Sequence, residues 1–83
     1  MAQIELFTDI DCDGTSSGII EEDFPNLGDF WNDTISSVRI YSGEWMLCSN
    51  ENYHGLCIVI GPGAHNMNGR VNDVISSLKA TVR

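Results

Sequence analysis

The chain has 83 residues, of which 42% are hydrophobic, so it suits one small globular domain and is too apolar for a disordered chain. Twelve acidic residues stand against four basic ones, and the net charge of −8 excludes a protein that binds nucleic acid through a basic patch. The same balance argues against binding to an anionic membrane surface.

Short strands separated by turns are the expected elements, in chain order. Apolar and polar residues alternate at 4–6, 38–40 and 78–82, which is typical of half-buried strands. Residues 56–60 form a denser apolar run, which predicts a central strand. Residues 21–31 can hold at most one turn of helix, because a proline and a glycine interrupt them.

The sequence predicts neither a membrane-spanning helix nor a signal peptide. No apolar run approaches the roughly 20 residues that a membrane-spanning helix needs. The first residues, MAQIELF, lack the basic and the long apolar regions of a secretory signal peptide. We therefore expect a soluble protein and favour the cytoplasm as its location.

An internal repeat organises the chain. The hexapeptide NDTISS at residues 32–37 returns as NDVISS at residues 72–77, an offset of 40, and Gly14 aligns with Gly55 at an offset of 41. The chain therefore divides into two units, residues 1–42 and 43–83, neither of which could bury a core alone. Two units of about four short strands each predict an all-β sandwich built from two Greek keys in a single domain.

The repeated hexapeptide offers oxygen atoms. Carbonyls, hydroxyls and one carboxylate per copy suit a hard cation such as Ca²⁺, and neither copy holds the His or Cys that zinc or copper would prefer. One acid cannot complete a shell of six to eight oxygens, so the two copies would have to share ligands. The alternative is an arch that only caps strand ends through its Asn, Asp and Ser side chains. Residues 9–14 begin like an EF-hand loop, but Ile20 occupies the position of the closing Glu, which predicts an acidic hairpin turn instead.

These motifs resemble those of the βγ-crystallins, in particular the single-domain calcium-binding members from microbes and invertebrates. The resemblance covers nearly the whole chain and rests on the doubled [ND][ND]xx[ST]S arch and an aromatic-x4-aromatic-x-Gly hairpin signature. Trp45 after Ser42-Gly43-Glu44, and Pro62-Gly63 after the apolar run, add to it. The resemblance implies a sandwich of two Greek keys that exchange one strand each. It also implies two calcium ions at one end, with no catalysis.

The resemblance further implies which residues bind each ion. The first ion would be bound by a backbone carbonyl from Thr34, the Ser36 hydroxyl, the Asp73 side chain and a carbonyl near Thr8. The second ion would be bound by Val74, Ser76 and Asp33 in the same roles and by a carbonyl near Ser49. Asn32 and Asn72 would brace the arches. Trp31 directly precedes the first arch, so its fluorescence should report binding.

The cysteines mark a departure from the family pattern. Cys12 replaces the second aromatic of the first hairpin signature, and Cys48 replaces the first aromatic of the second, which should weaken both hairpin corners. An odd number of cysteines without CxxC spacing disfavours zinc, and small apolar core residues are their ordinary role. The sequence leaves open whether Cys48 and Cys57 form a disulfide.

Two other functions remain open at this stage. The chain could be a structural crystallin-like protein that needs no calcium, or an inhibitor or toxin-type module that binds through loops such as residues 61–70. We expect a monomer or weak dimer whose partners are calcium ions, without nucleic acid or membrane.

Overall fold

Two antiparallel sheets make up the computed structural model, which describes residues 1–31, 34–67 and 75–82. The first sheet has the order β2-β1-β3-β6 and contains β1 (Gln3–Asp9), β2 (Asp13–Ile20), β3 (Ser37–Ser42) and β6 (Gly63–Asn66). The second has the order β5-β4-β7 and contains β4 (Glu44–Cys48), β5 (Cys57–Ile60) and β7 (Ser77–Val82). One helical turn, α1 (Gly28–Trp31), and a short 3₁₀ segment, η1 (Glu51–Tyr53), complete the described elements.

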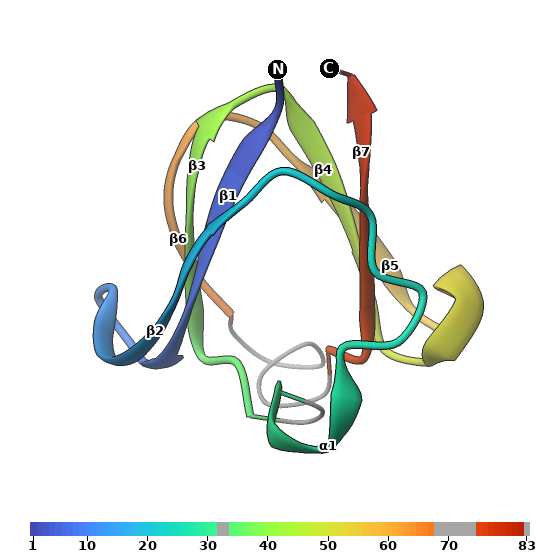
Figure 1. The fold of residues 1–83 in the computed structure, drawn as a ribbon, viewed down its shortest axis with the longest axis horizontal. Helices are drawn as coiled ribbons and strands as arrows, with labels where there is room; N and C mark the ends of the chain where they lie inside the picture. The colour runs from blue at the N-terminus through green and yellow to red at the C-terminus, as the bar shows by residue number, and fades with distance from the viewer. Residues whose placement is uncertain (32–33, 68–74, 83) are drawn as a thin grey trace.

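Each half of the chain contributes a segment to the sheet of the other half. Strand β6, from the second half, pairs with β3 and places His65 opposite Val38. In return, Phe24 of the first half bridges β7, where its backbone N–H and carbonyl bond those of Leu78 at 2.8 and 2.9 Å. Figure 1 shows the two sheets as facing layers, with both chain ends together at one end and α1 at the other. The expected sandwich of two Greek keys is confirmed, and the exchange consists of a strand, β6, in one direction and a single bridge at Phe24 in the other.

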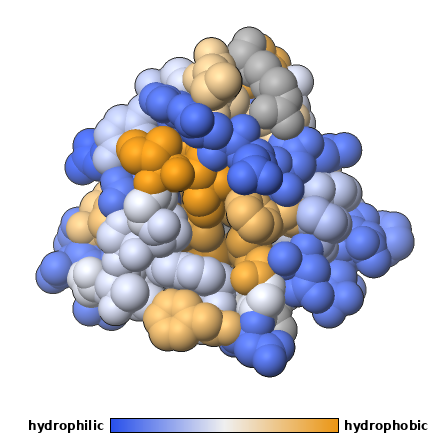
Figure 2. Space-filling model, viewed as in Figure 1, coloured by the Kyte–Doolittle hydropathy of each residue, from blue (hydrophilic) through white to orange (hydrophobic). Residues whose placement is uncertain are grey.

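The core lies between the two sheets and follows from the alternation in the sequence. Ile4 and Leu6 of β1 are fully buried, and so are Trp45 and Leu47 of β4, because alternate residues of a strand point to the same face. Ile35 joins this core from the first hexapeptide, and so does Ile75 from the second. Figure 2 shows hydrophobic residues along the middle of one face, flanked by hydrophilic residues on both sides.

One strand prediction is wrong in position. Residues 56–60 are not a central strand, because β5 lies at the edge of its sheet and β4 lies in the middle. The dense apolar run does not correspond to burial on both faces, since Val59 is 55% exposed. The remaining strand expectations and the single turn of helix are confirmed by the bounds of β1, β3, β7 and α1. Within the described residues, no helix is long and apolar enough to cross a membrane.

Candidate metal centre

Two hairpins with the same backbone conformation form part of the candidate metal centre. We call residues 8–15 the first hairpin and residues 49–56 the second hairpin. Asp11 and Cys12 have positive φ angles of 60° and 56°, and Asn52 and Tyr53 repeat this at 57° and 64°. This left-handed backbone is unfavourable for residues with a Cβ, so its recurrence at an offset of 41 shows that both units impose the same folded turn.

A hydroxyl closes each hairpin in the same way. The N–H of Thr15 donates to Thr8 Oγ1, and the N–H of Leu56 donates to Ser49 Oγ, both at 2.9 Å. Gly55 is required because a Cβ at that position would collide with the Ser49 hydroxyl. The side chains of Thr8 and Ser49 therefore serve the turns, so an ion contact from these positions is expected to come from the backbone carbonyl.

The fifth residue of each hexapeptide is joined to the base of the hairpin in its own unit. The N–H of Ser36 donates to the carbonyl of Phe7 at 3.0 Å, and the N–H of Ser76 donates to the carbonyl of Cys48 at 2.9 Å. Phe7 and Cys48 directly precede Thr8 and Ser49. The structure thus brings together, in both units, two of the positions that the sequence analysis assigned to one ion.

The fifth residues also connect the two units. The carbonyl of Ser36 accepts a hydrogen bond from Met67 N–H at 2.8 Å, and the carbonyl of Ser76 accepts one from Leu27 N–H at 2.9 Å. In both cases the donor belongs to the other half of the chain. The fifth residue of each hexapeptide is thus bonded to a residue of the opposite unit, at the end of the sandwich near α1 (Figure 1).

Thr34, the third residue of the first hexapeptide, is hydrogen-bonded back to α1. Its N–H donates to the Trp31 carbonyl at 3.1 Å, and its hydroxyl donates to the Phe30 carbonyl at 2.7 Å. These bonds occupy carbonyls at the C-terminal end of α1, which a helix end leaves without partners inside the helix. The five other assigned residues lie outside the described residues: Asn32, Asp33, Asn72, Asp73 and Val74.

The sixth residues of the hexapeptides have a role that the sequence analysis missed. Ser77 is fully buried, and its hydroxyl donates to the Asn50 carbonyl at 2.6 Å while accepting from Tyr53 N–H at 3.1 Å. Ser37 does the same in the first unit, donating to Asp9 at 2.5 Å and accepting from Cys12 at 2.9 Å. These serines hold the hairpins down on the sheets. The sequence offered one signal for this role. The sixth residue of each hexapeptide is the first residue of a strand, so its side chain should point to the opposite face from that of the fifth residue.

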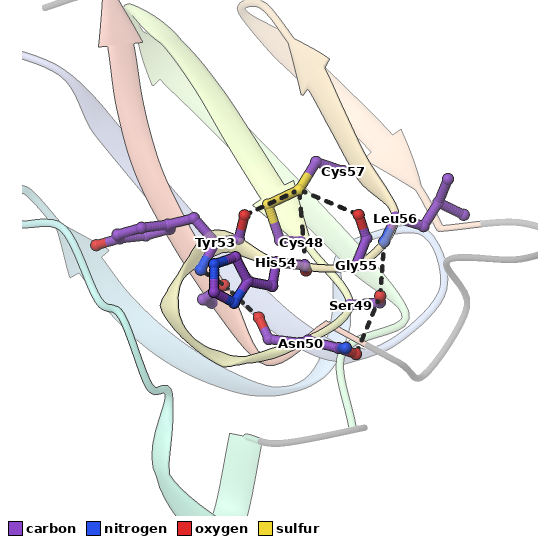
Figure 3. Close-up of a disulfide and its surroundings, with 9 residues drawn as sticks. Cys48, Ser49, Asn50, Tyr53, His54, Gly55, Leu56 and Cys57 are labelled. Carbon is purple, nitrogen blue, oxygen red and sulfur yellow. Dashed lines mark hydrogen bonds between the residues drawn. A yellow bond between two sulfur atoms is a disulfide. The ribbon is translucent and has the colours of Figure 1, made fainter.

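A disulfide between Cys48 and Cys57, whose Cα atoms are 4.1 Å apart, joins the two ends of the second hairpin (Figure 3). The two residues lie directly opposite each other on β4 and β5. The question that the sequence left open is therefore answered, and Cys12 is a free cysteine. Cys48 is fully buried, as expected of a small apolar core residue, whereas Cys57 is only partly buried, and the disulfide joins the two. A covalent bond joins the strands where the missing aromatic was expected to weaken the second corner.

Charges around the second hairpin act on Tyr53. Partial burial of the phenol and the nearby negative charge of Asp23 raise the pKa of Tyr53. The ammonium of Lys79 lies 4.8 Å from the centre of the Tyr53 ring, a cation–π contact that helps to hold the ring over β7. Among the described residues, no cluster of three or more His, Cys, Asp or Glu side chains could hold a metal. An ion here would therefore depend on carbonyl and hydroxyl oxygens together with the carboxylates of the hexapeptides.

Another shifted group lies on the outer surface of the first sheet, among side chains of β1, β2 and β3. The hydroxyls of Ser16 and Tyr41 donate to the Glu5 carboxylate, and with a smaller contribution from Arg39 they lower the pKa of Glu5. The same hydrogen bond raises the pKa of Tyr41. This cluster joins neighbouring strands and contains none of the assigned metal ligands.

Comparison with known proteins decides the family. The model of the family described as Beta/Gamma crystallin matches residues 3–81. The chain belongs to the βγ-crystallin family. No curated protein matches this βγ-crystallin chain.

Solved structures agree with this assignment. The βγ-crystallin chain is 30% identical to a βγ-crystallin from an archaeon, with a TM-score of 0.85 and coverage of 95% of this chain and 96% of the other. It is 28% identical to one from Ciona intestinalis, with a TM-score of 0.87 and coverage of 95% and 99%. A βγ-crystallin domain from Flavobacterium johnsoniae is 29% identical, with a TM-score of 0.79 and coverage of 96% and 94%.

Proposed function

We propose that this βγ-crystallin binds two calcium ions at the end of the sandwich that carries the arches, and that the ions stabilise the fold without catalysis. The observation that supports this most is the repeated bond from the fifth arch residue to the residue before the hairpin carbonyl. It occurs as Ser36 to Phe7 and as Ser76 to Cys48. Two independent parts of each unit, both rich in oxygen, are thereby held side by side.

The proposed ligands are those that the family pattern implies. One ion would take the carbonyls of Thr8 and Thr34, the Ser36 hydroxyl and the Asp73 carboxylate. The other would take the corresponding groups of Ser49, Val74, Ser76 and Asp33, while Asn32 and Asn72 brace the arches. All of these donors are oxygens, which fits a hard cation, and water would complete each shell.

Stabilisation would follow from linkage. An ion that binds the folded arches and not the unfolded chain adds about 2.7 kcal/mol per site at a hundredfold excess over its Kd. Sharing ligands between the arches would make each ion a bridge between the two halves of the chain. For a chain of this length, a gain of that size corresponds to a rise in melting temperature of roughly 15 °C per site.

Thermal melting in calcium and in EDTA tests the proposal. Asp33→Ala and Asp73→Ala should each reduce the calcium-dependent rise in melting temperature and lower the affinity measured by calorimetry. Asp29→Ala, which removes a carboxylate outside both hexapeptides, is the matched control and should keep the full rise. Trp31 fluorescence should follow the titration in the wild type. Equal melting in calcium and EDTA, with no heat of binding at low millimolar calcium, would select a structural protein that needs no ion.

A further inference from the structure

The two hairpins are held to their sheets by different chemistry. In the first unit, Phe7 lies opposite Ser16 on β2 and Ser37 on β3, and we call this row the first corner. In the second unit, the matching row is Cys48 with Cys57 on β5 and Ser77 on β7, the second corner. The serine is the same in both rows. The buried phenyl ring of the first corner is replaced in the second by the disulfide.

The disulfide closes a loop around the second hairpin. Its two cysteines are nine residues apart and enclose residues 49–56, most of which are exposed. No residue of η1 is buried, and Asn52 and Tyr53 keep the unfavourable positive φ described above. A segment with few buried apolar contacts opens easily unless a bond holds its ends. The first hairpin is equally exposed, at residues 9–11 and 13–15, so the two hairpins differ in what lies at their bases, the buried ring of Phe7 in one and the disulfide in the other.

The same bond lies at the base of the candidate metal centre. The carbonyl of Cys48 accepts the Ser76 N–H of the second arch, and Ser49 follows Cys48 directly. Figure 3 shows the disulfide over the turn of the second hairpin, with the Cys57 sulfur near the carbonyls of Tyr53, His54 and Gly55. Cys57 Sγ lies 3.6 Å from the Tyr53 carbonyl, at the turn itself. A change in the link between the cysteines would thus reach both the turn and the arch.

We propose that the Cys48–Cys57 disulfide is a redox-controlled lock on the second hairpin. Oxidised, it holds residues 49–56 folded over the sheet; reduced, it releases them, while the first hairpin stays closed by Phe7. Because Ser49 belongs to the second ion site, reduction also weakens calcium binding at that site, a consequence that rests on the proposed function.

The chemistry needs a dithiol as reductant. Its thiolate attacks the partly exposed Cys57 sulfur, forms a mixed disulfide and releases Cys48 as a thiolate, which takes up a proton. The second thiol of the reagent then displaces Cys57. The products are two cysteine thiols and one oxidised reagent, so two electrons pass to the protein, and air or an oxidised dithiol reverses the step.

Amide hydrogen exchange of the oxidised and the dithiothreitol-reduced protein, both in EDTA, tests the lock without calcium. We expect reduction to lower protection in residues 49–56 by at least about tenfold, and to change residues 8–15 by less than about twofold. The matched control is the double variant Cys48→Phe, Cys57→Ser, which copies the Phe7–Ser16 pair into the second unit. Its second hairpin should show the same protection with and without dithiothreitol. Equal protection of residues 49–56 in the two forms of the wild type would overturn the proposal.

Calcium titration of the same samples separates the two proposals. Reduction should weaken one of two binding steps in the wild type by about tenfold and neither step in the double variant. If no calcium binds in either redox state, the proposed function fails, while the exchange result still decides the lock. If both steps weaken equally, the effect is not local to the second hairpin and the link to the second site is wrong.

Discussion

Replacement of Ser77 by alanine should cost this small protein much of its stability. The Ser77 hydroxyl is fully buried and makes two hydrogen bonds, to the Asn50 carbonyl and from the Tyr53 N–H. Ser77→Ala leaves both backbone groups without this partner, at about 1–2 kcal/mol each, so we expect a loss of roughly 2–4 kcal/mol. A domain of 83 residues has only about 4–12 kcal/mol to lose.

Thermal and chemical denaturation of the oxidised protein in EDTA measure this loss. One kcal/mol corresponds to about 6 °C at this length, so the melting temperature should fall by roughly 12–24 °C. Ser42→Ala is the matched control, because within the described part of the chain its hydroxyl bonds just the carbonyl of the exposed Met1, and it should cost less than about 0.5 kcal/mol. A fall of less than about 3 °C for Ser77→Ala would show that the second hairpin does not depend on this buried hydroxyl.

Two further predictions concern backbone and charge. Gly55→Ala should lower the free energy of unfolding by more than about 2 kcal/mol, because Gly55 has a φ of +81° and a Cβ there would collide with the Ser49 hydroxyl. Gly18 has a similar φ of +75° but open space around it, so Gly18→Ala should lower the free energy of unfolding by only about 1–2 kcal/mol. Urea unfolding of both variants measures the difference. The folded-state pKa of Glu5 lies below 4.5, so its stabilising contribution is present above that value and is lost as the pH falls through the lowered pKa. Glu5→Gln should therefore lose less stability than the wild type below pH 4.5, and parallel melting curves against pH would contradict this.

The disulfide is a second candidate for the added link that so short a chain needs to stabilise its small core. A domain of this size has a marginal core and commonly uses an added link. The resemblance to the βγ-crystallins implies one such link, calcium ions shared by the two arches. The structure adds a covalent one within the second unit, between Cys48 and Cys57. The proposed ions would join the two halves of the chain, and the disulfide joins two neighbouring strands, so the two links would stabilise different parts of the sandwich.

Local pattern was enough to predict most of the strands. Alternation in β1 and β3 matched burial, because each of these strands has one face on the core and side-chain direction follows from period two. In β7 only the bounds of the strand were predicted, because Leu78 is buried while Val82 is 54% exposed. The repeat of residues 32–37 at 72–77 predicted two similar units, and both hexapeptides contribute a buried isoleucine to the core. Composition alone excluded a basic binding surface, because four basic residues are too few to form one.

Properties that depend on distant residues needed the tertiary structure. The place of β5 at the edge of its sheet depends on which strands pair with each other, and a run of apolar residues carries no information about strand pairing. The bonds of Ser37 and Ser77 to the hairpins span 24 to 28 residues, so spacing within the hexapeptide could not reveal them. Pairing of Cys48 with Cys57 likewise required the register of β4 against β5. The sequence by itself determined the two units and their oxygen-rich arches; only folding decided which atoms of the hairpins meet them, because hydrogen-bond partners are set in space and not along the chain.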